Sequence, residues 1–154
     1  MAKKLADRLA TVLKIAKSEY DKALKAYSQL EQQYLAEVNK CQSLKAYRKE
    51  YVASINQTGQ AGMKANELQV YFRFIHELDN LCDKQHKVIE RIKQEKESAR
   101  EFYLKAKQKA DSLEKIIEKE DVREAKKLAK SEQKALDELS QKARNGNTLN
   151  SPFE

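Results

Sequence analysis

The sequence predicts an all-α fold: a long antiparallel two-helix coiled-coil hairpin with a C-terminal helix overhang. The 154 residues are 36% charged and contain only one proline and three glycines, a composition typical of long helices. Two of these glycines, Gly59 and Gly62, lie close together, where they can reverse the chain. On both sides of them, apolar side chains recur every three or four residues, as in the seam of a coiled coil.

Residues 3–56 are predicted to form the first helix. Apolar or aromatic side chains recur at alternating intervals of four and three residues. Only two of these positions, Glu37 and Arg48, are charged instead. The seam consists of Leu9, Leu13, Ala16, Tyr20, Ala23, Tyr27, Leu30, Tyr34, Glu37, Cys41, Leu44, Arg48, Tyr51 and Ile55. A seam of this length requires a partner helix to cover it.

Residues 57–65 are predicted to form the turn, because Gly59 and Gly62 permit the backbone angles that a reversal needs. Asn66 is the expected N-cap of the second helix. A turn this short predicts that the two helices are antiparallel neighbours.

Residues 66–144 are predicted to form the second helix, whose seam is interrupted only by Gln85 and Lys96. The seam consists of Leu68, Tyr71, Ile75, Leu78, Cys82, Gln85, Ile89, Ile92, Lys96, Ala99, Tyr103, Ala106, Ala110, Leu113 and Ile117. Laid antiparallel, the two seams match in a single register. The predicted pairs are Ile55–Leu68, Tyr51–Tyr71, Leu44–Leu78, Cys41–Cys82, Glu37–Gln85, Leu30–Ile92, Ala23–Ala99, Tyr20–Tyr103, Ala16–Ala106 and Leu9–Leu113. The Glu37–Gln85 layer is expected to hydrogen-bond and fix the register.

The second helix is predicted to outlast the first from about residue 118. This overhang is rich in lysine and glutamate, with a thin apolar stripe of Leu128, Leu136 and Leu139. Residues 145–154 are predicted to be a disordered tail, since Asn145 and Gly146 are typical of a helix end.

The net charge of +7 favours an acidic partner, an anionic membrane surface or nucleic acid. Lysines alternate with glutamates and form no basic block, so nucleic acid is not the expected partner. No apolar run approaches the roughly 20 residues of a membrane span. Asp7 and Arg8 interrupt the N-terminal apolar pattern, which is therefore not that of a signal peptide, and we expect a cytosolic protein.

No arrangement of side chains indicates an enzyme, a cofactor or a metal, because a two-helix hairpin encloses no pocket. Cys41, Cys82 and His86 come together in the predicted register, but they lack a fourth metal ligand. A disulfide would need an oxidising compartment. We interpret the cysteines as small core residues beside a surface histidine, and His76 as a second surface histidine.

Apolar side chains near the turn exceed what two helices can hide. Tyr47 and Phe74 lie off the seam, yet each continues a row of seam residues at helical spacing. The rows are Leu44–Tyr47–Tyr51 and Phe74–Leu78–Leu81. Such a surface indicates a contact site for a partner, the alternative being a seam that is simply wide.

These turn residues resemble the FliJ family of the bacterial flagellar type III export apparatus. The matching segments are YRKEY at residues 47–51, the reversal with Gly62 and Asn66, and YFRFIHEL at residues 71–78. Elsewhere the similarity is the heptad pattern that any coiled coil shares. Injectisome stalk proteins have a similar architecture.

The resemblance implies a non-enzymatic stalk similar to that of the rotary ATPase γ subunit. It implies that the end carrying the helix termini enters the hexameric export ATPase and that the turn end engages the cytoplasmic domain of the export-gate membrane protein. It also implies assistance to export chaperone cycling, and thereby a part in motility and chemotaxis. The implied location is the cytoplasm, peripheral at the inner membrane through these partners, with a monomer when alone.

The resemblance also implies which residues contact the export gate. The family's gate-binding row, here called the gate row, falls on Leu44, Tyr47, Tyr51, Phe74 and Leu78. The chain departs from the family at three further positions of that row, which are Lys40, Leu81 and Gln85. Leu44, Tyr51 and Leu78 are also seam residues and are expected to lie inside the hairpin. Tyr47 and Phe74 are therefore the expected direct contacts.

Three alternatives to a flagellar stalk remain open. One is a scaffold that self-associates through the surplus apolar rows, which sedimentation would distinguish from a monomeric stalk. Another is an injectisome stalk protein. The last is a basic binder of nucleic acid or membrane surfaces, which would bind any polyanion in a salt-sensitive way.

Overall fold

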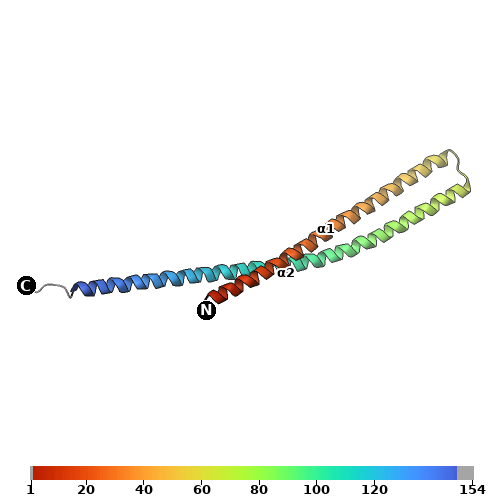
Figure 1. Cartoon of the computed structure of the whole chain (residues 1–154). Coiled ribbons are helices and arrows are strands. Elements are labelled where there is room, and N and C mark those ends of the chain that lie inside the picture. Colours follow the sequence, from red (N-terminus) through yellow and green to blue (C-terminus); the bar gives the residue numbers. More distant parts are fainter. Residues whose placement is uncertain (1, 149–154) are drawn as a thin grey trace, which may run out of the picture. The chain divides into compact units, whose positions relative to one another are not determined.

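The computed structural model describes residues 2–148, and the side chains of residues 5–147. It contains two helices, α1 (Ala2–Gln60) and α2 (Ala65–Thr148), joined by a short turn (Figure 1). The helices pack against each other with opposite directions, and the described residues form no strand. The predicted all-α antiparallel hairpin is therefore confirmed.

The helix ends lie farther out than the sequence predicts. The first helix ends at Gln60 instead of residue 56, and α2 ends at Thr148 instead of residue 144. Residues 145–148, predicted as tail, are thus helical, and the rest of that tail lies outside the described residues. Gly146 continues the helix because glycine lowers helix stability by only about 1 kcal/mol and does not forbid the conformation.

The turn depends on one residue in the left-handed region. Gly62 has φ 95°, the only positive φ among the described residues, and its N–H donates to the carbonyl of Gly59. A side chain at Gly62 would strain this backbone. Asn66 is not the N-cap that the sequence predicts: the Lys64 carbonyl accepts the first N–H groups, and Asn66 lies inside the first turn of α2.

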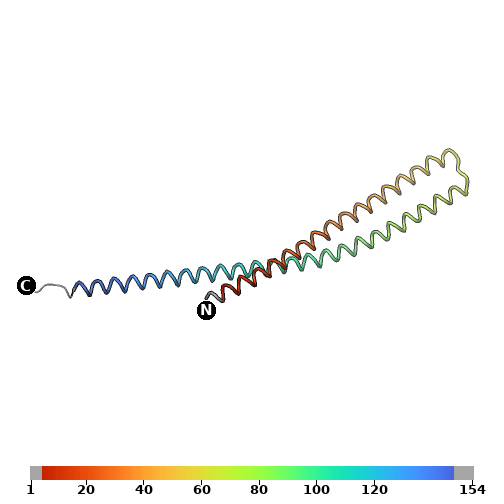
Figure 2. Tube along the Cα trace, viewed as in Figure 1, coloured from red at the N-terminus to blue at the C-terminus, as the bar shows by residue number. Residues whose placement is uncertain are grey.

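The chain forms two compact units, each built from part of α1 and part of α2. The turn unit comprises residues 18–107 and therefore includes the turn. The terminal unit comprises, among the described residues, 2–17 and 108–148. In the turn unit the two helices run side by side on either side of the reversal (Figure 2).

Contacts across the turn unit follow the predicted register. The rings of Tyr51 and Tyr71 lie 5.4 Å apart, centroid to centroid. Farther from the turn, Gln85 Nε2 donates to the Glu37 carboxylate and to the Glu37 backbone carbonyl. The buried apolar side chains of this unit are Ala23, Cys41, Ile55, Leu78, Cys82 and Ile92, all of them predicted seam residues. The 3.5-residue repeat therefore locates the core of this unit correctly.

Stacked tyrosines join the helices at the end of the turn unit that is farthest from the turn. Tyr103 lies between Tyr20 and Tyr27, with ring centroids 5.5 and 5.8 Å away. The Tyr27 hydroxyl donates to Glu31 over 2.9 Å, and this hydrogen bond raises the pKa of Tyr27. The sequence predicts the Tyr20–Tyr103 pair, but the second stack became visible only in the structure.

In the terminal unit, packing is confined to the part where both helices are present. Ala16 and Ala110 are buried, and Lys17 Nζ lies 2.8 Å from Glu114 Oε1. From residue 121 to residue 147 every side chain of α2 is exposed, including the predicted stripe of Leu128, Leu136 and Leu139.

Candidate partner-binding site at the turn end

The gate row gathers beside the turn, on the last turns of α1 and the first turns of α2. Spacings of three and four residues place Leu44, Tyr47 and Tyr51 on one side of α1. Phe74 and Leu78 lie on the side of α2 that packs against them. The structure therefore brings together residues that are 34 positions apart at most, counted from Leu44 to Leu78.

Aromatic rings form the centre of this site. The Phe74 ring lies 4.6 Å from the Tyr51 ring and 6.3 Å from the Tyr47 ring, the latter edge-on at 75°. The Tyr47 and Tyr51 rings stack at 6.4 Å. Offset and edge-on pairs are the favourable arrangements of aromatic rings, so each ring of this cluster is packed by its neighbours.

The members of the gate row differ in exposure. Leu78 is 4% exposed and therefore packs inside the hairpin, while Tyr47 is 49% exposed. Leu44, Tyr51 and Phe74 are half-buried. Tyr47 is therefore the most accessible member of the gate row.

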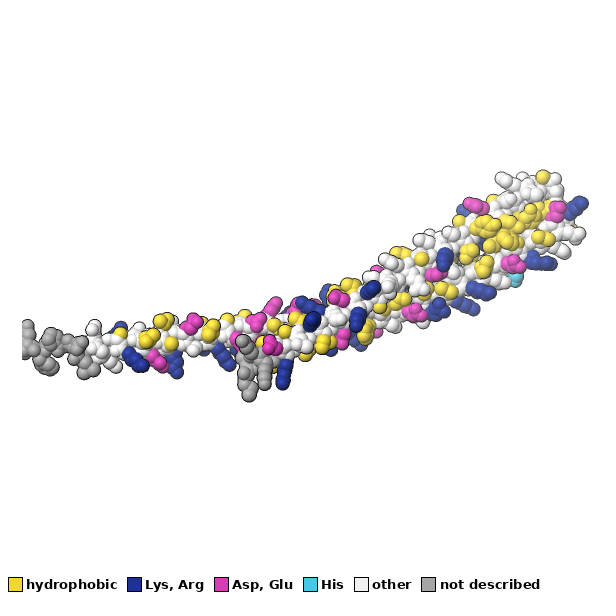
Figure 3. Space-filling view, viewed as in Figure 1, with side chains coloured by type: hydrophobic (Ala, Val, Ile, Leu, Met, Phe, Trp, Pro, Cys, Tyr) yellow, Lys and Arg dark blue, Asp and Glu magenta, His cyan; other side chains and the backbone are white. Residues whose placement is uncertain are grey.

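A shallow groove continues the gate row away from the turn. It is lined by Ala36, Asn39, Lys40, Ser43, Leu44, Tyr47 and Gln85. Lys40 and Gln85, two positions where the chain departs from the family pattern, thus lie beside the aromatic cluster. The third, Leu81, is 49% exposed. Figure 3 shows hydrophobic side chains concentrated at this end of α1 and α2.

Two groups at or beside the site, Tyr51 and Glu37, have shifted pKa values. Burial, followed by the neighbouring hydroxyls of Tyr71 and Tyr47, raises the pKa of Tyr51. The hydrogen bond from Gln85, followed by that from Lys40, lowers the pKa of Glu37. Near neutral pH the Tyr51 phenol is therefore uncharged, and the Glu37 carboxylate, which is already hydrogen-bonded, is ionised.

An ion pair that sequence reasoning missed links the helices close to the gate row. Arg48 Nε lies 2.6 Å from Asp79 Oδ1, and Arg48 Nη2 lies 3.4 Å from Asp79 Oδ2. The sequence shows Arg48 only as an interruption of the seam. Its placement in the predicted register, close to an aspartate of the other helix, was the signal that could have revealed the pair.

The cysteines lie where the sequence predicts. Cys41 and Cys82 are both free and buried, and Cys41 Sγ lies 3.9 Å from Nε2 of the exposed His86. Among the described residues, no group of three or more histidine, cysteine or acidic side chains has an arrangement that could hold a metal ion. Neither described helix has a stretch long and apolar enough to cross a membrane.

Comparison with known proteins identifies one matching family. The family described as "Flagellar FliJ protein" matches residues 5–148, nearly the whole chain. No curated protein and no solved structure gives a significant match. The family match covers both the aromatic site at the turn and the exposed part of α2.

Proposed function

The chain belongs to the flagellar FliJ family, and from that premise we propose that it acts as a stalk that couples the export ATPase to the export gate. As a member of this family it is a component of the flagellar export apparatus, and the family is non-catalytic. The proposal assigns one partner to each unit. The turn unit binds the cytoplasmic domain of the export-gate membrane protein, and the terminal unit binds the hexameric ATPase.

One observation carries this proposal: a packed aromatic cluster lies at the turn with Tyr47 exposed at its surface. Large aromatic side chains that are held in place before binding lose little conformational entropy in a complex, and they dominate many protein interfaces. The cluster supports a protein-binding role at this end.

The proposed stalk also assists the cycling of export chaperones at the cytoplasmic face of the inner membrane. The family match favours a flagellar stalk over an injectisome stalk, since the matching family is described as flagellar. The membrane association in this proposal is indirect and passes through the export gate.

The gate contact is tested by measuring the affinity of the purified gate cytoplasmic domain for a Tyr47→Ala, Phe74→Ala double variant. We expect affinity to fall at least 30-fold, because each truncation removes part of a central aromatic anchor. Circular dichroism should show a hairpin that is still helical, since Tyr47 is exposed and Phe74 half-buried.

The matched control is Phe72→Ala. Phe72 lies two positions from Phe74 on α2 and is 59% exposed, but it takes part in none of the ring contacts of the cluster. The control should bind the gate domain like the unaltered chain. Equal binding by the double variant and the control would refute the assignment of the gate row.

The ATPase contact is tested by the hydrolysis rate of the hexameric export ATPase with and without this protein. Stimulation that saturates with added protein is expected. An unchanged rate, together with no measurable binding, would refute the coupling role.

The exposed leucines of α2 favour one alternative, a scaffold that self-associates. Leu128, Leu136 and Leu139 are 63%, 59% and 64% exposed. Sedimentation equilibrium distinguishes the two functions: the stalk remains a monomer over a wide concentration range, whereas the scaffold forms dimers or larger assemblies.

A further inference from the structure

The exposed part of α2, residues 121–147, is an amphipathic helix that no other described part of the chain covers. Four large apolar side chains project from it, and each is more than half exposed. They are Val122, Leu128, Leu136 and Leu139, at 54%, 63%, 59% and 64%. Helical spacing places them on one side of α2, together with several alanines. This segment therefore has an apolar side, but the hairpin gives it nothing to pack against.

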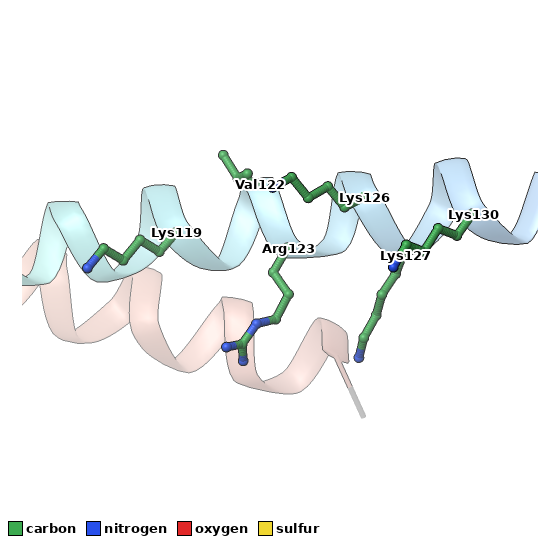
Figure 4. A pocket seen from close by; sticks show the side chains of 6 residues that line it. All are labelled: Lys119, Val122, Arg123, Lys126, Lys127 and Lys130. Carbon is green, nitrogen blue, oxygen red and sulfur yellow. The ribbon is translucent and has the colours of Figure 1, made fainter.

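A row of cations borders this apolar side. Five cations line a shallow surface groove together with Val122, and they are here called the basic row: Lys119, Arg123, Lys126, Lys127 and Lys130. Figure 4 shows Val122 and Lys126 along one edge of this surface and Arg123 and Lys127 along the other. Since Val122 and Lys126 are one helical turn apart, the apolar side passes directly into the cationic side.

Most of the positive charge of the row has no partner within the described chain. Arg123 Nη1 lies 3.4 Å from Glu120 Oε1, whereas the four lysines have no ion-pair partner among the described residues. Helical spacing places Glu120, Glu124 and Glu138 on the side of α2 opposite Val122. A surface that meets α2 on the Val122 side therefore faces cations and apolar groups, and these three carboxylates lie away from it.

One acidic residue departs from this segregation. Glu132 lies one turn from both Leu128 and Leu136, on the apolar side of the helix. Its ionised carboxylate opposes the burial of the two leucines. A partner that covers the apolar side is therefore held weakly and is released readily.

An anionic lipid surface matches both sides of this helix. Helices that lie on a membrane insert an apolar side at the headgroup boundary, while lysines and arginines pair with the phosphates of anionic lipids. A nucleic acid would leave the leucines uncovered, and residues 104–147 contain no aromatic ring on which bases could stack. A second copy of the chain could cover the leucines, but with its net charge of +7 it is not complementary to the basic row.

We propose that residues 119–139 of α2 bind the surface of an anionic membrane. Val122 and the leucines enter the boundary between headgroups and acyl chains, and the basic row pairs with lipid phosphates. The helix lies in the plane of the membrane and does not cross it. This contact goes beyond the proposed stalk function and does not depend on it. It adds a direct attachment to the indirect one that passes through the export gate.

The lipid preference is tested by co-sedimentation of the full chain with vesicles. One set contains phosphatidylcholine alone, and in the other about one third of the lipid is phosphatidylglycerol, which is anionic. We expect binding to the mixed vesicles to be roughly tenfold stronger, because several cations act together at the charged surface. Equal binding to both sets, or no detectable binding to the mixed vesicles, would overturn the proposal.

The basic row is tested by the triple variant Lys126→Glu, Lys127→Glu, Lys130→Glu. The matched control, Lys87→Glu, Lys93→Glu, Lys105→Glu, reverses three exposed lysines of the turn unit and changes the net charge equally. Binding to the mixed vesicles should fall roughly tenfold for the row variant and less than about threefold for the control. Lysine and glutamate have similar helix propensities, so both variants should fold, as circular dichroism will verify. An equal loss in both would mean that net charge and not the row is responsible, and the proposal would be wrong.

The apolar side is tested by the double variant Leu128→Ala, Leu136→Ala. Its control, Leu35→Ala, Leu104→Ala, truncates two leucines of the turn unit that are 60% and 44% exposed. Binding to the mixed vesicles should fall roughly fivefold for the first pair and stay unchanged for the control. If binding depends on the row but not on the leucines, the row is a general polyanion site and the proposal is overturned. A single-stranded oligonucleotide that binds the unaltered chain but not the row variant would then identify the ligand class as nucleic acid.

Glu132 offers a test in which binding should increase. Glu132→Gln removes the carboxylate from the apolar side, so binding to the mixed vesicles should rise about threefold. Glu124→Gln changes the net charge equally on the opposite side of the helix from Val122 and should have a smaller effect. Equal effects of the two substitutions would contradict the orientation proposed for the helix on the membrane.

These measurements use vesicles and no partner protein. Their failure would remove the lipid contact and leave the proposed stalk function intact. An export ATPase that this protein neither binds nor stimulates would refute the stalk function without affecting the lipid contact.

Discussion

The turn end and the exposed part of α2 carry opposite kinds of surface. At the turn end, both helices contribute to a cluster in which Phe74 contacts the rings of Tyr47 and Tyr51, and an ion pair links the helices nearby. In the exposed part of α2, a single helix presents exposed lysines. The first surface is apolar and packed from two helices. The second is charged and exposed.

This difference indicates two modes of binding within one chain. Aromatic rings that are packed against one another have less conformational freedom to lose on binding, so they suit a specific contact of defined geometry. Exposed cations on long side chains suit attraction over a distance and contacts that tolerate small displacements. A protein that must hold one partner and repeatedly release another needs both.

The largest difference between the two regions is expected when one leucine in each is truncated. Leu78 is 4% exposed, so Leu78→Ala should destabilise the hairpin by about 2–4 kcal/mol through lost burial and the cavity that remains. Leu128 is 63% exposed, so Leu128→Ala should change stability by less than about 0.5 kcal/mol. Urea unfolding followed by circular dichroism measures both. Similar values for the two variants would show that the exposed segment is covered in solution.

Salt should separate the two contacts next. Raising NaCl from about 50 mM to about 300 mM should weaken ATPase stimulation roughly tenfold, because exposed ion pairs are screened. Binding of the gate domain should change less than about twofold, since the gate row presents uncharged rings. Titrations of each partner at both salt concentrations check this, and equal sensitivity would argue against different chemistries at the two ends.

A smaller effect is expected from the ion pair near the gate row. Both side chains are nearly half exposed, at 41% for Arg48 and 47% for Asp79. Asp79→Asn should therefore lower stability by no more than about 1 kcal/mol. A double-mutant cycle with Arg48→Gln gives the coupling energy. A coupling well above that value would mean that the pair is shielded from water more than its exposure indicates.

The smallest expected effect concerns pH. Since its hydrogen bonds to Gln85 and Lys40 lower the pKa of Glu37, the folded state favours the ionised carboxylate. This contribution to stability is present above the unfolded-state pKa of about 4.5 and is lost as pH falls through the lower folded-state value. The melting temperature of Glu37→Gln should consequently fall less between pH 7 and pH 3 than that of the unaltered chain. If the melting temperatures of both proteins fall equally, the Glu37–Gln85 layer does not contribute to the loss of stability in acid.

The sequence predicts those parts of the fold that depend on helix periodicity. A 3.5-residue repeat indicates which side of each helix is buried. When both helices carry such a repeat, only a few alignments of one helix along the other pair their apolar residues. Tyr51 and Tyr71 consequently meet as predicted, as do Glu37 and Gln85. Burial of the cysteines follows from the same pattern.

The parts that the sequence does not predict depend on side-chain reach or on small energy differences. Arg48 reaches Asp79 through a long side chain whose rotamer no repeat specifies. The helix passes Gly146 because a penalty of about 1 kcal/mol is easily outweighed by its neighbours. At the gate row, spacing alone assigns Tyr47 and Phe74 to one side of the hairpin, but not the edge-on geometry that joins them.

The Glu37–Gln85 layer has a mechanical consequence. If α2 slid along α1 by one heptad in either direction, the carboxylate of Glu37 would face Leu78 or Ile92 in place of Gln85, and both of those side chains are almost completely buried. The carboxylate would then lose the hydrogen bond that α2 donates to it and keep only that from Lys40 of its own helix, so the step is disfavoured. The Glu37–Gln85 layer thereby resists sliding of the two helices of the turn unit. A force applied along one helix is transmitted to the other.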